Sequence, residues 1–173
     1  MNIIHRDLKP LNILLKNHGI SDSIRIADFG LAGYIPKWGY NPKLEGAMGT
    51  HLYMAPELVL NKGHDKKVDI WACGLILYNL LFQGKNPFYE KGESKSEISE
   101  NIVNKEIDFK QLKSSIEAKD LLKRMLEKDS GKRYLAGDAL NHPWITGKSI
   151  SERALTADEL MSMFQCRIDI KLA

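Results

Sequence analysis

The stretch from His5 to Asn12 reads His-Arg-Asp-Leu-Lys-Pro-Leu-Asn. It places a carboxylate (Asp7), an ammonium group (Lys9) and a carboxamide (Asn12) within one short loop, and Pro10 stiffens the chain between them. A carboxylate can orient an attacking hydroxyl, a cation can neutralise a moving phosphoryl group, and an amide oxygen can help to hold magnesium. The stretch therefore predicts a site for phosphoryl transfer.

A second carboxylate follows at Asp28, in the triplet Asp28-Phe29-Gly30. The residues before it, Ile24–Ala27, alternate apolar and polar side chains, which predicts a short strand that ends at Asp28. Magnesium in proteins prefers few carboxylates, together with phosphate oxygens of the substrate. One aspartate and one asparagine suit that preference, so we expect Asn12 and Asp28 to be metal ligands.

Five short motifs in order along the chain resemble those of the eukaryotic protein kinases. His5–Asn12 is similar to the catalytic loop, and Asp28-Phe29-Gly30 is similar to the metal-binding motif. Ala55-Pro56-Glu57 is similar to the end of the activation segment, and Asp69 is similar to the aspartate that opens a buried helix. Arg133 is similar to the arginine that pairs with the glutamate at the position of Glu57. The resemblance runs from about residue 2 to residue 147.

The resemblance implies a role for each residue of the predicted site. Asp7 is expected to be the catalytic base, and Lys9 is expected to contact the transferred phosphate, so that both are catalytic residues. Asn12 and Asp28 are expected to hold Mg²⁺ and, with Lys9, to bind the cofactor ATP. His5 is expected to be a buried packing residue.

Further details resemble the serine/threonine kinases. The Lys9-Pro10 pair is typical of them, and Thr50 stands where those enzymes place a threonine against the catalytic aspartate and lysine. The expected partner is thus a protein substrate with a serine or threonine hydroxyl. Leu11 replaces a glutamate that many relatives use to hold a basic residue of the substrate, which places a preference for basic substrates in doubt.

Arg6 resembles the arginine that gathers around a phosphate on the activation loop. Glu45 lies near the usual position of that phosphate. Two interpretations stay open: Glu45 supplies a standing negative charge to Arg6, or Glu45 is a solvated loop residue.

The later part of the chain resembles the calcium/calmodulin-dependent and calcium-dependent kinases, through Gly84–Phe88, His142–Ile145 and an amphipathic tail. The tail carries one apolar stripe, made of Met161, Phe164, Ile168 and Leu172. It is expected either to pack against the domain or to act as a regulatory helix that binds calmodulin or a calcium-binding domain.

The expected fold is mainly α, with a few short strands near the N-terminus. By resemblance it is the C-terminal lobe of a kinase, over residues 1–147, followed by a tail at 148–173 with a possible regulatory helix. The glycine-rich loop and strand lysine of the family's N-terminal lobe are not found in the sequence. We therefore expect these 173 residues alone to be an incomplete catalytic domain with little activity. The alternative is a non-catalytic, kinase-like interaction module.

The local patterns predict particular elements. Ile13–Leu15 and Ile24–Ala27 are expected to be strands, residues 31–55 a long ordered loop, and Val68–Phe82 a helix that is buried on all sides. An amphipathic helix is expected to turn Ile116, Leu121, Leu122, Met125 and Leu126 inward. Three capping boxes are expected, at Ser94 with Glu97, Ser114 with Glu117, and Thr156 with Glu159.

Composition excludes several other classes. With 43% apolar and 27% charged residues, the chain can bury a globular core, and its longest apolar run, Ile70–Phe82, is well under the roughly 20 residues that span a bilayer. The sequence predicts no signal peptide, no membrane partner and, from two cysteines, a reduced cytoplasmic setting. The net charge of +3 comes from Lys and Arg scattered among Asp and Glu, so no nucleic-acid partner is expected.

Overall fold

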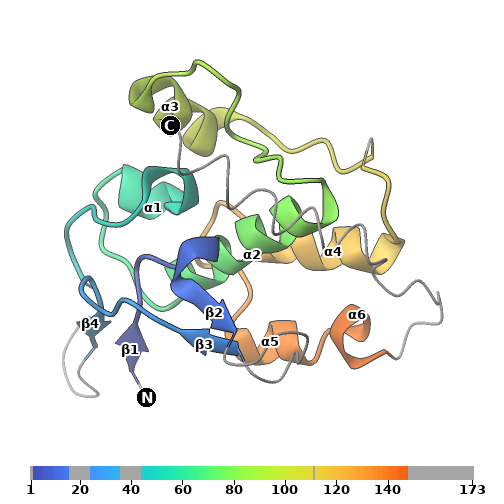
Figure 1. The fold of residues 1–173 in the computed structure, drawn as a ribbon, viewed down its shortest axis with the longest axis horizontal. Helices are drawn as coiled ribbons and strands as arrows, with labels where there is room; N and C mark the ends of the chain where they lie inside the picture. The colour runs from blue at the N-terminus through green and yellow to red at the C-terminus, as the bar shows by residue number, and fades with distance from the viewer. Residues whose placement is uncertain (1, 16–23, 36–43, 111, 148–173) are drawn as a thin grey trace.

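The computed structural model describes residues 2–15, 24–35, 44–110 and 112–147. Short strands lie in the first part of the chain, and helices make up most of the rest, which agrees with the predicted fold class (Figure 1). The strands are β1 (Ile3–Ile4), β2 (Ile13–Leu15), β3 (Ile24–Ile26) and β4 (Gly33–Tyr34), and the helices are α1 (Pro56–Val59), α2 (Lys67–Leu81), α3 (Lys95–Asn104), α4 (Ile116–Met125), α5 (Ala136–Leu140) and α6 (Pro143–Thr146).

The strands form two small antiparallel pairs. Strands β2 and β3 pair in the register Ile13↔Ile26 to Leu15↔Ile24, which confirms the two predicted strands. Strand β1 pairs with β4, and β4 lies inside the stretch 31–55 that the sequence predicted to be a loop. A 3₁₀ helix at His51–Tyr53 lies in the same stretch. These elements are too short to produce a periodic pattern, so the prediction of an irregular loop needed correction there.

Helix α2 crosses the centre of the molecule, as its uniformly apolar sequence predicted (Figure 1). Trp71 and Leu75 are fully buried, and most other side chains of the helix are buried with them. At Gly74, an added Cβ would lie 2.9 Å from Leu126 Cδ2 and 3.0 Å from Met125 Cβ. The absence of a side chain at Gly74 therefore lets the end of α4 pack directly on α2.

Helix α4 confirms part of the predicted inward face and corrects the rest. Leu121, Leu122, Met125 and Leu126 are buried, but Ile116 is 81% exposed. Ile116 lies five residues before Leu121, which places it about 140° around the helix from the buried face.

The N-terminus of α4 also differs from the prediction by one residue. Ser115 is the N-cap, and its side chain accepts a hydrogen bond from Ala118 N at 3.1 Å. The predicted capping box at Ser114 and Glu117 is therefore wrong. Either serine can cap a helix, but only Ser114 has a glutamate three residues later, and that pattern pointed to the wrong serine.

Helix α3 begins at the capping box that the sequence predicted. Ser94 Oγ accepts from Glu97 N at 3.3 Å, and Glu97 Oε2 accepts from Ser94 N at 2.7 Å. Ile98 and Ile102 bury the inner face of this helix in the core. The third predicted box, at Thr156, and the tail stripe lie outside the described residues.

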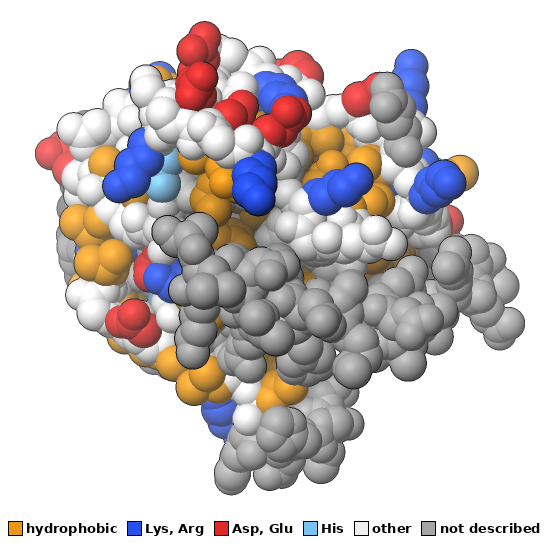
Figure 2. Space-filling model, turned by 45° about the horizontal axis from the view of Figure 1, so that its top comes forward, with side chains coloured by type: hydrophobic (Ala, Val, Ile, Leu, Met, Phe, Trp, Pro, Cys, Tyr) orange, Lys and Arg blue, Asp and Glu red, His pale blue; other side chains and the backbone are white. Residues whose placement is uncertain are grey.

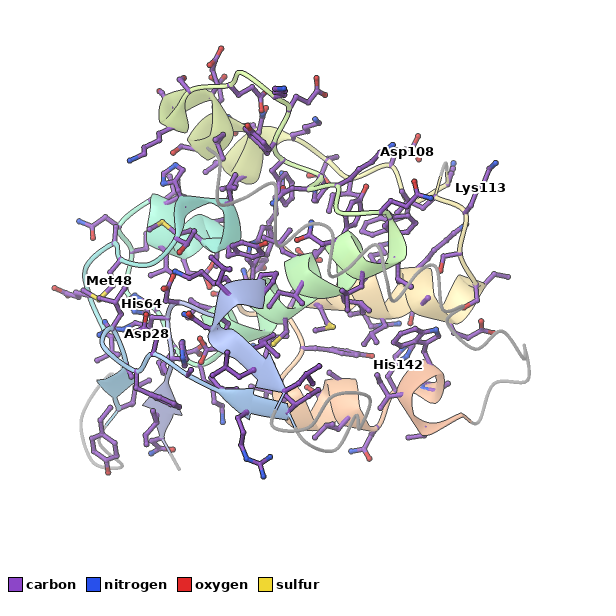
Figure 3. The ribbon with its side chains drawn as sticks, viewed as in Figure 1. Asp28, Met48, His64, Asp108, Lys113 and His142 are labelled. Carbon is purple, nitrogen blue, oxygen red and sulfur yellow. The ribbon has the colours of Figure 1, made fainter. Side chains whose placement is uncertain are left out.

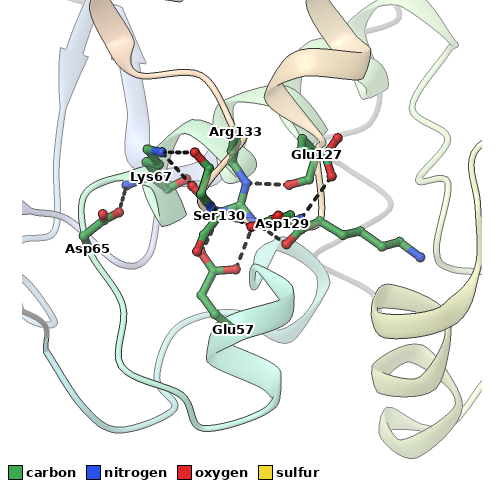
Figure 4. Close-up of polar contacts among 9 residues, drawn as sticks. Glu57, Asp65, Lys67, Glu127, Asp129, Ser130 and Arg133 are labelled. Carbon is green, nitrogen blue, oxygen red and sulfur yellow. Dashed lines mark hydrogen bonds and ion pairs between the residues drawn. The ribbon is translucent and has the colours of Figure 1, made fainter.

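A buried ion pair joins α1 to the segment that follows α4, as predicted (Figure 4). The Arg133 guanidinium donates to Glu57 Oε1 at 2.7 Å and to Glu57 Oε2 at 2.9 Å. Arg133 also donates to the Glu127 carbonyl at 2.7 Å and lies 5.0 Å from the centre of the Trp71 ring. The pair thus ties α1 to the helical core.

The surface of the described residues adds two observations. None of their helices has both the length and the apolar character that crossing a membrane requires. On the face shown in Figure 2, Lys and Arg side chains lie apart from one another, separated by apolar and uncharged groups, and Asp and Glu lie among them.

Candidate active site

The predicted catalytic loop is anchored to the start of the buried helix α2. His5 N donates to Asp69 Oδ2 at 2.8 Å, and Arg6 N donates to Asp69 Oδ1 at 2.9 Å. Arg6 has a φ of +65°, a left-handed conformation that a non-glycine residue rarely adopts. Burial raises the pKa of Asp69, and these two backbone hydrogen bonds oppose that effect. Asp69 therefore fixes the turn from which Asp7 projects.

His5 links this loop to the chain around Asp28. Its Nδ1 accepts from Asp7 N at 3.3 Å, so its Nε2 carries the proton and donates to the Ala27 carbonyl at 3.0 Å. The ring also meets Phe29 edge to face, with centroids 4.9 Å apart. These contacts agree with the structural role that we expected for His5.

Asp7, Lys9 and Thr50 form a closed ring of hydrogen bonds. Lys9 Nζ donates to Asp7 Oδ2 at 2.7 Å and to Thr50 Oγ1 at 2.8 Å. Thr50 donates twice to Asp7 Oδ1, from its hydroxyl at 2.7 Å and from its backbone N–H at 2.6 Å. Both oxygens of the carboxylate are therefore held in fixed positions, and the contact predicted for Thr50 is confirmed.

The surroundings of Asp7 keep it ionised. Burial alone would raise the pKa of its carboxyl, but the hydrogen bonds from Lys9 and Thr50 and the charge of Lys9 outweigh burial. The pKa of Asp7 lies below its usual range as a result. At neutral pH the group is a carboxylate that can accept a hydrogen bond from a hydroxyl.

Asn12 lies next to this ring, at the end of the 3₁₀ helix Pro10–Asn12. Its Nδ2 donates to the Asp7 carbonyl at 2.8 Å and makes a longer contact of 3.4 Å to Asp7 Oδ2. Because the amide nitrogen is used in this way, Oδ1 is the atom that Asn12 can offer to a cation. The Asn12 carbonyl accepts from Ala27 N at 2.9 Å, which brings the residue before Asp28 to the same place.

Asp28 is exposed and has a φ of +62°. Its Oδ1 accepts from Gly30 N at 3.3 Å. Figure 3 shows Asp28 at the same end of the molecule as His64, far from Asp108, Lys113 and His142. The structure thus brings Asp7, Lys9 and Asn12 into direct contact, and it connects Asp28 to them through the backbone at Ala27.

The donor atoms in this region suit magnesium. Asn12 Oδ1 and the Asp28 carboxylate are hard oxygen donors, and a small number of protein oxygens together with phosphate oxygens is the coordination that Mg²⁺ favours. The residues present therefore fit a nucleotide held through Mg²⁺.

Arg6 does not contact Glu45. Within the described residues no ion pair joins them, and Arg6 Nε instead donates to the Leu31 carbonyl at 2.7 Å. Glu45 is exposed, which favours its interpretation as a solvated loop residue.

One residue close to this site, His51, was not singled out by the sequence patterns. His51 directly follows Thr50, and its ring bonds helix α3 at Lys95 and Ser99. Those partners lie 44 and 48 residues further along the chain, so no local pattern could have revealed the contact.

Residues 1–145 match the protein kinase domain family. The chain is 37% identical to calcium-dependent protein kinase 29 of Arabidopsis thaliana over 175 residues, which cover 99% of this chain and 32% of the relative. It is 43% identical to myosin light chain kinase A of Dictyostelium discoideum over 148 residues, which cover 84% of this chain and 48% of the relative. It is 47% identical to calcium-dependent protein kinase 6 of Plasmodium berghei over 148 residues, which cover 84% of this chain and 10% of the relative.

The chain therefore belongs to the protein kinase family. Within that family its relatives are calcium-dependent and myosin light chain kinases, which confirms the serine/threonine, calcium-related branch that the motifs indicated. The chain spans half or less of the length of these relatives.

Proposed function

We propose that this chain supplies the catalytic base, the phosphate-contacting lysine and the metal ligands for phosphoryl transfer from ATP to a serine or threonine hydroxyl of a protein. The observation that carries the proposal is the hydrogen-bonded ring of Asp7, Lys9 and Thr50, with Asn12 beside it. A ring that fixes both oxygens of one carboxylate provides the positioning on which this reaction depends.

In this proposal Asp7 orients the acceptor hydroxyl and takes its proton. Its ionised state and its restrained oxygens suit that role, because a general base must offer a lone pair in a fixed direction. Lys9, already within 2.7 Å of Asp7, adds positive charge where the phosphoryl group transfers. Thr50 keeps the base and the lysine together.

Asn12 and Asp28 would hold Mg²⁺ and, through it, the phosphates of ATP. When bound, the metal neutralises charge on those phosphates. Asp28 is exposed and lies two residues after the end of the short strand β3, so its carboxylate is accessible to such a ligand.

Strands β2 and β3 expose an apolar surface beside these residues. The exposed side chains include Leu14, Leu15, Ile24, Ile26 and Phe29. Exposed apolar patches mark surfaces that bind a partner. We propose that a further nucleotide-binding segment packs on this surface to complete the site, and that these 173 residues alone transfer phosphate slowly or not at all.

Fusion of the chain to a related nucleotide-binding segment tests this proposal. A nucleotide-binding segment taken from a related kinase is joined to residue 1, and phosphate transfer to a serine-containing protein is compared with that of the chain alone. We expect the fusion to be active and the chain alone to show little activity. An inactive fusion that binds MgATP would instead favour the non-catalytic interaction module.

We also propose that the chain works in the cytoplasm. A separate proposal is that the tail at 148–173 binds a calcium-linked partner, either calmodulin or a calcium-binding domain. The names of the relatives support a link to calcium. Calmodulin binding to the full chain, measured by calorimetry with and without calcium and compared with residues 1–147, tests the proposal for the tail. Equal heats for the two chains would contradict it.

A further inference from the structure

Helix α3 is joined to the active-site segment by one imidazole ring. His51 Nε2 lies 2.9 Å from the Lys95 carbonyl and 2.8 Å from Ser99 Oγ. A carbonyl can only accept, so His51 Nε2 carries the proton and shares it between these two oxygens. Ser99 Oγ in turn donates to the Lys95 carbonyl at 2.9 Å. The three groups form a compact polar junction on the first turns of α3.

This junction continues directly to the catalytic carboxylate. Thr50, the residue before His51, donates its N–H and its hydroxyl to Asp7 Oδ1. The backbone of Thr50 is therefore restrained on one side by Asp7 and on the other by the bonds of His51 to α3. After His51 the chain turns into the 3₁₀ helix His51–Tyr53, in which Tyr53 N donates to the Thr50 carbonyl at 2.9 Å.

We propose that His51 is a positioning residue for phosphoryl transfer, which sets the position of Thr50, and hence of Asp7, by anchoring the segment to α3. The inference rests on the proposed function. Its consequence is that a displacement of α3 is transmitted through His51 to Thr50 and Asp7.

Helix α3 does not depend on His51 for its own place in the fold. Ile98 and Ile102 are buried in the core, and the capping box at Ser94 closes the first turn. Loss of the imidazole should therefore leave α3 in place and release Thr50. If His51 served only to stabilise α3, its loss would instead speed amide exchange in α3 and leave exchange at the Thr50 amide unchanged.

Amide hydrogen exchange on the full chain separates these outcomes without any need for activity. One intramolecular hydrogen bond corresponds to about a three- to tenfold effect on a local equilibrium, so we expect His51→Ala to speed exchange at the Thr50 amide by that factor. His51→Gln places an N–H near the position of Nε2 and should restore exchange to within about twofold. Ser99→Ala should give a smaller effect, and Ser96→Ala, at an exposed serine of the same helix, should give none.

Kinetics of the fused enzyme provide the second readout. His51→Ala should lower kcat by about three- to tenfold with the KM for ATP unchanged, and His51→Gln should restore it. Unchanged Thr50 exchange in His51→Ala, with faster exchange only in α3, would overturn the inference. Faster Thr50 exchange in a fused enzyme that shows no transfer would contradict the proposed function, whereas the anchoring of Thr50 to α3 by His51 would still hold.

Discussion

Arg133 is a fully buried cation, and Glu57 is its carboxylate partner. Removal of one member of such a pair leaves the other charge buried without compensation. We expect Glu57→Ala to lower the free energy of unfolding by about 3–5 kcal/mol, measured by urea denaturation. Lys132→Ala removes an exposed partner of Asp129 and should cost less than about 1 kcal/mol. Equal effects from the two variants would contradict this account of the buried pair.

His64 is buried, and among the described residues neither of its ring nitrogens makes a hydrogen bond of ordinary geometry. Burial lowers its pKa below 6.5 and the nearby charge of Arg6 adds to that effect, although the backbone of Lys62 and, to a smaller extent, the charges of Glu57 and Asp65 oppose it. The unfolded chain therefore binds a proton near pH 6.5 that the folded chain does not bind, and stability is lost as the pH falls below that value.

His64→Leu should remove this dependence on pH. It should also raise the free energy of unfolding at pH 6 by about 1 kcal/mol, because the poorly hydrogen-bonded ring nitrogens are gone. Denaturation curves between pH 5 and pH 8 measure both effects. A variant with the same slope as the parent over that range would show that another group is responsible.

At the level of elements, the N-terminus of α4 allows two neighbouring serines to be compared as helix caps. Ser115 caps α4 through Ala118 N, whereas the neighbouring Ser114 does not. We expect Ser115→Ala to cost about 1 kcal/mol and Ser114→Ala to cost much less, measured by thermal unfolding. The reverse order would restore the capping box that the sequence first indicated.

The contact of α2 with α4 depends on Gly74. Alanine favours helices more than glycine does, but its Cβ at this position would press on Leu126 and Met125. We expect Gly74→Ala to lower stability by about 1–3 kcal/mol. Gly137→Ala in α5, where nothing lies within 4 Å of the added Cβ, should instead leave stability equal or higher. Thermal unfolding of the two variants measures both effects. A Gly74→Ala variant that is more stable than the parent would mean that α2 and α4 can move apart to accept the added methyl group at little cost.

The sequence predicted the elements that depend on local pattern. The uniformly apolar stretch gave α2, and the Ser94 signal gave the start of α3. It did not predict β4, because a two-residue strand has no period. It wrongly placed Ile116 on the buried face of α4, although the five-residue spacing from Leu121 already puts Ile116 about 140° around the helix.

In the candidate site, too, the contacts within one loop could be predicted from the sequence, and the contacts between distant parts of the chain could not. Asp7, Lys9 and Asn12 lie within one loop, and their contacts followed from its spacing together with the family resemblance. The bonds of Asp69 to the loop, 63 and 64 residues away, and of His51 to α3 join distant parts of the chain, so only the fold reveals their geometry. Asp28 was expected to lie close to the others, and the structure links it to the loop through its neighbours Ala27 and Phe29.

At the scale of the whole molecule, the account depends on one closed ring of side chains. Asp7, Lys9 and Thr50 are held by three separate parts of the fold, namely the loop before β2, the anchor at Asp69 and the segment before α1. An apolar surface on β2 and β3 lies beside them. If these features contribute to a kinase active site, phosphate transfer must depend on the carboxylate of Asp7, and a correctly folded chain without that carboxylate must be inactive.

Transfer of radiolabelled phosphate from ATP by the fused enzyme, with and without Asp7→Asn, tests this claim most directly. Asn keeps the shape of the side chain but cannot take a proton, so kcat should fall by about 10²- to 10⁴-fold while MgATP still binds. Glu100→Gln, at an exposed acid of α3, is the matched control and should leave kcat unchanged. Label should appear on serine or threonine. Equal rates for Asp7→Asn and the parent enzyme would contradict the account.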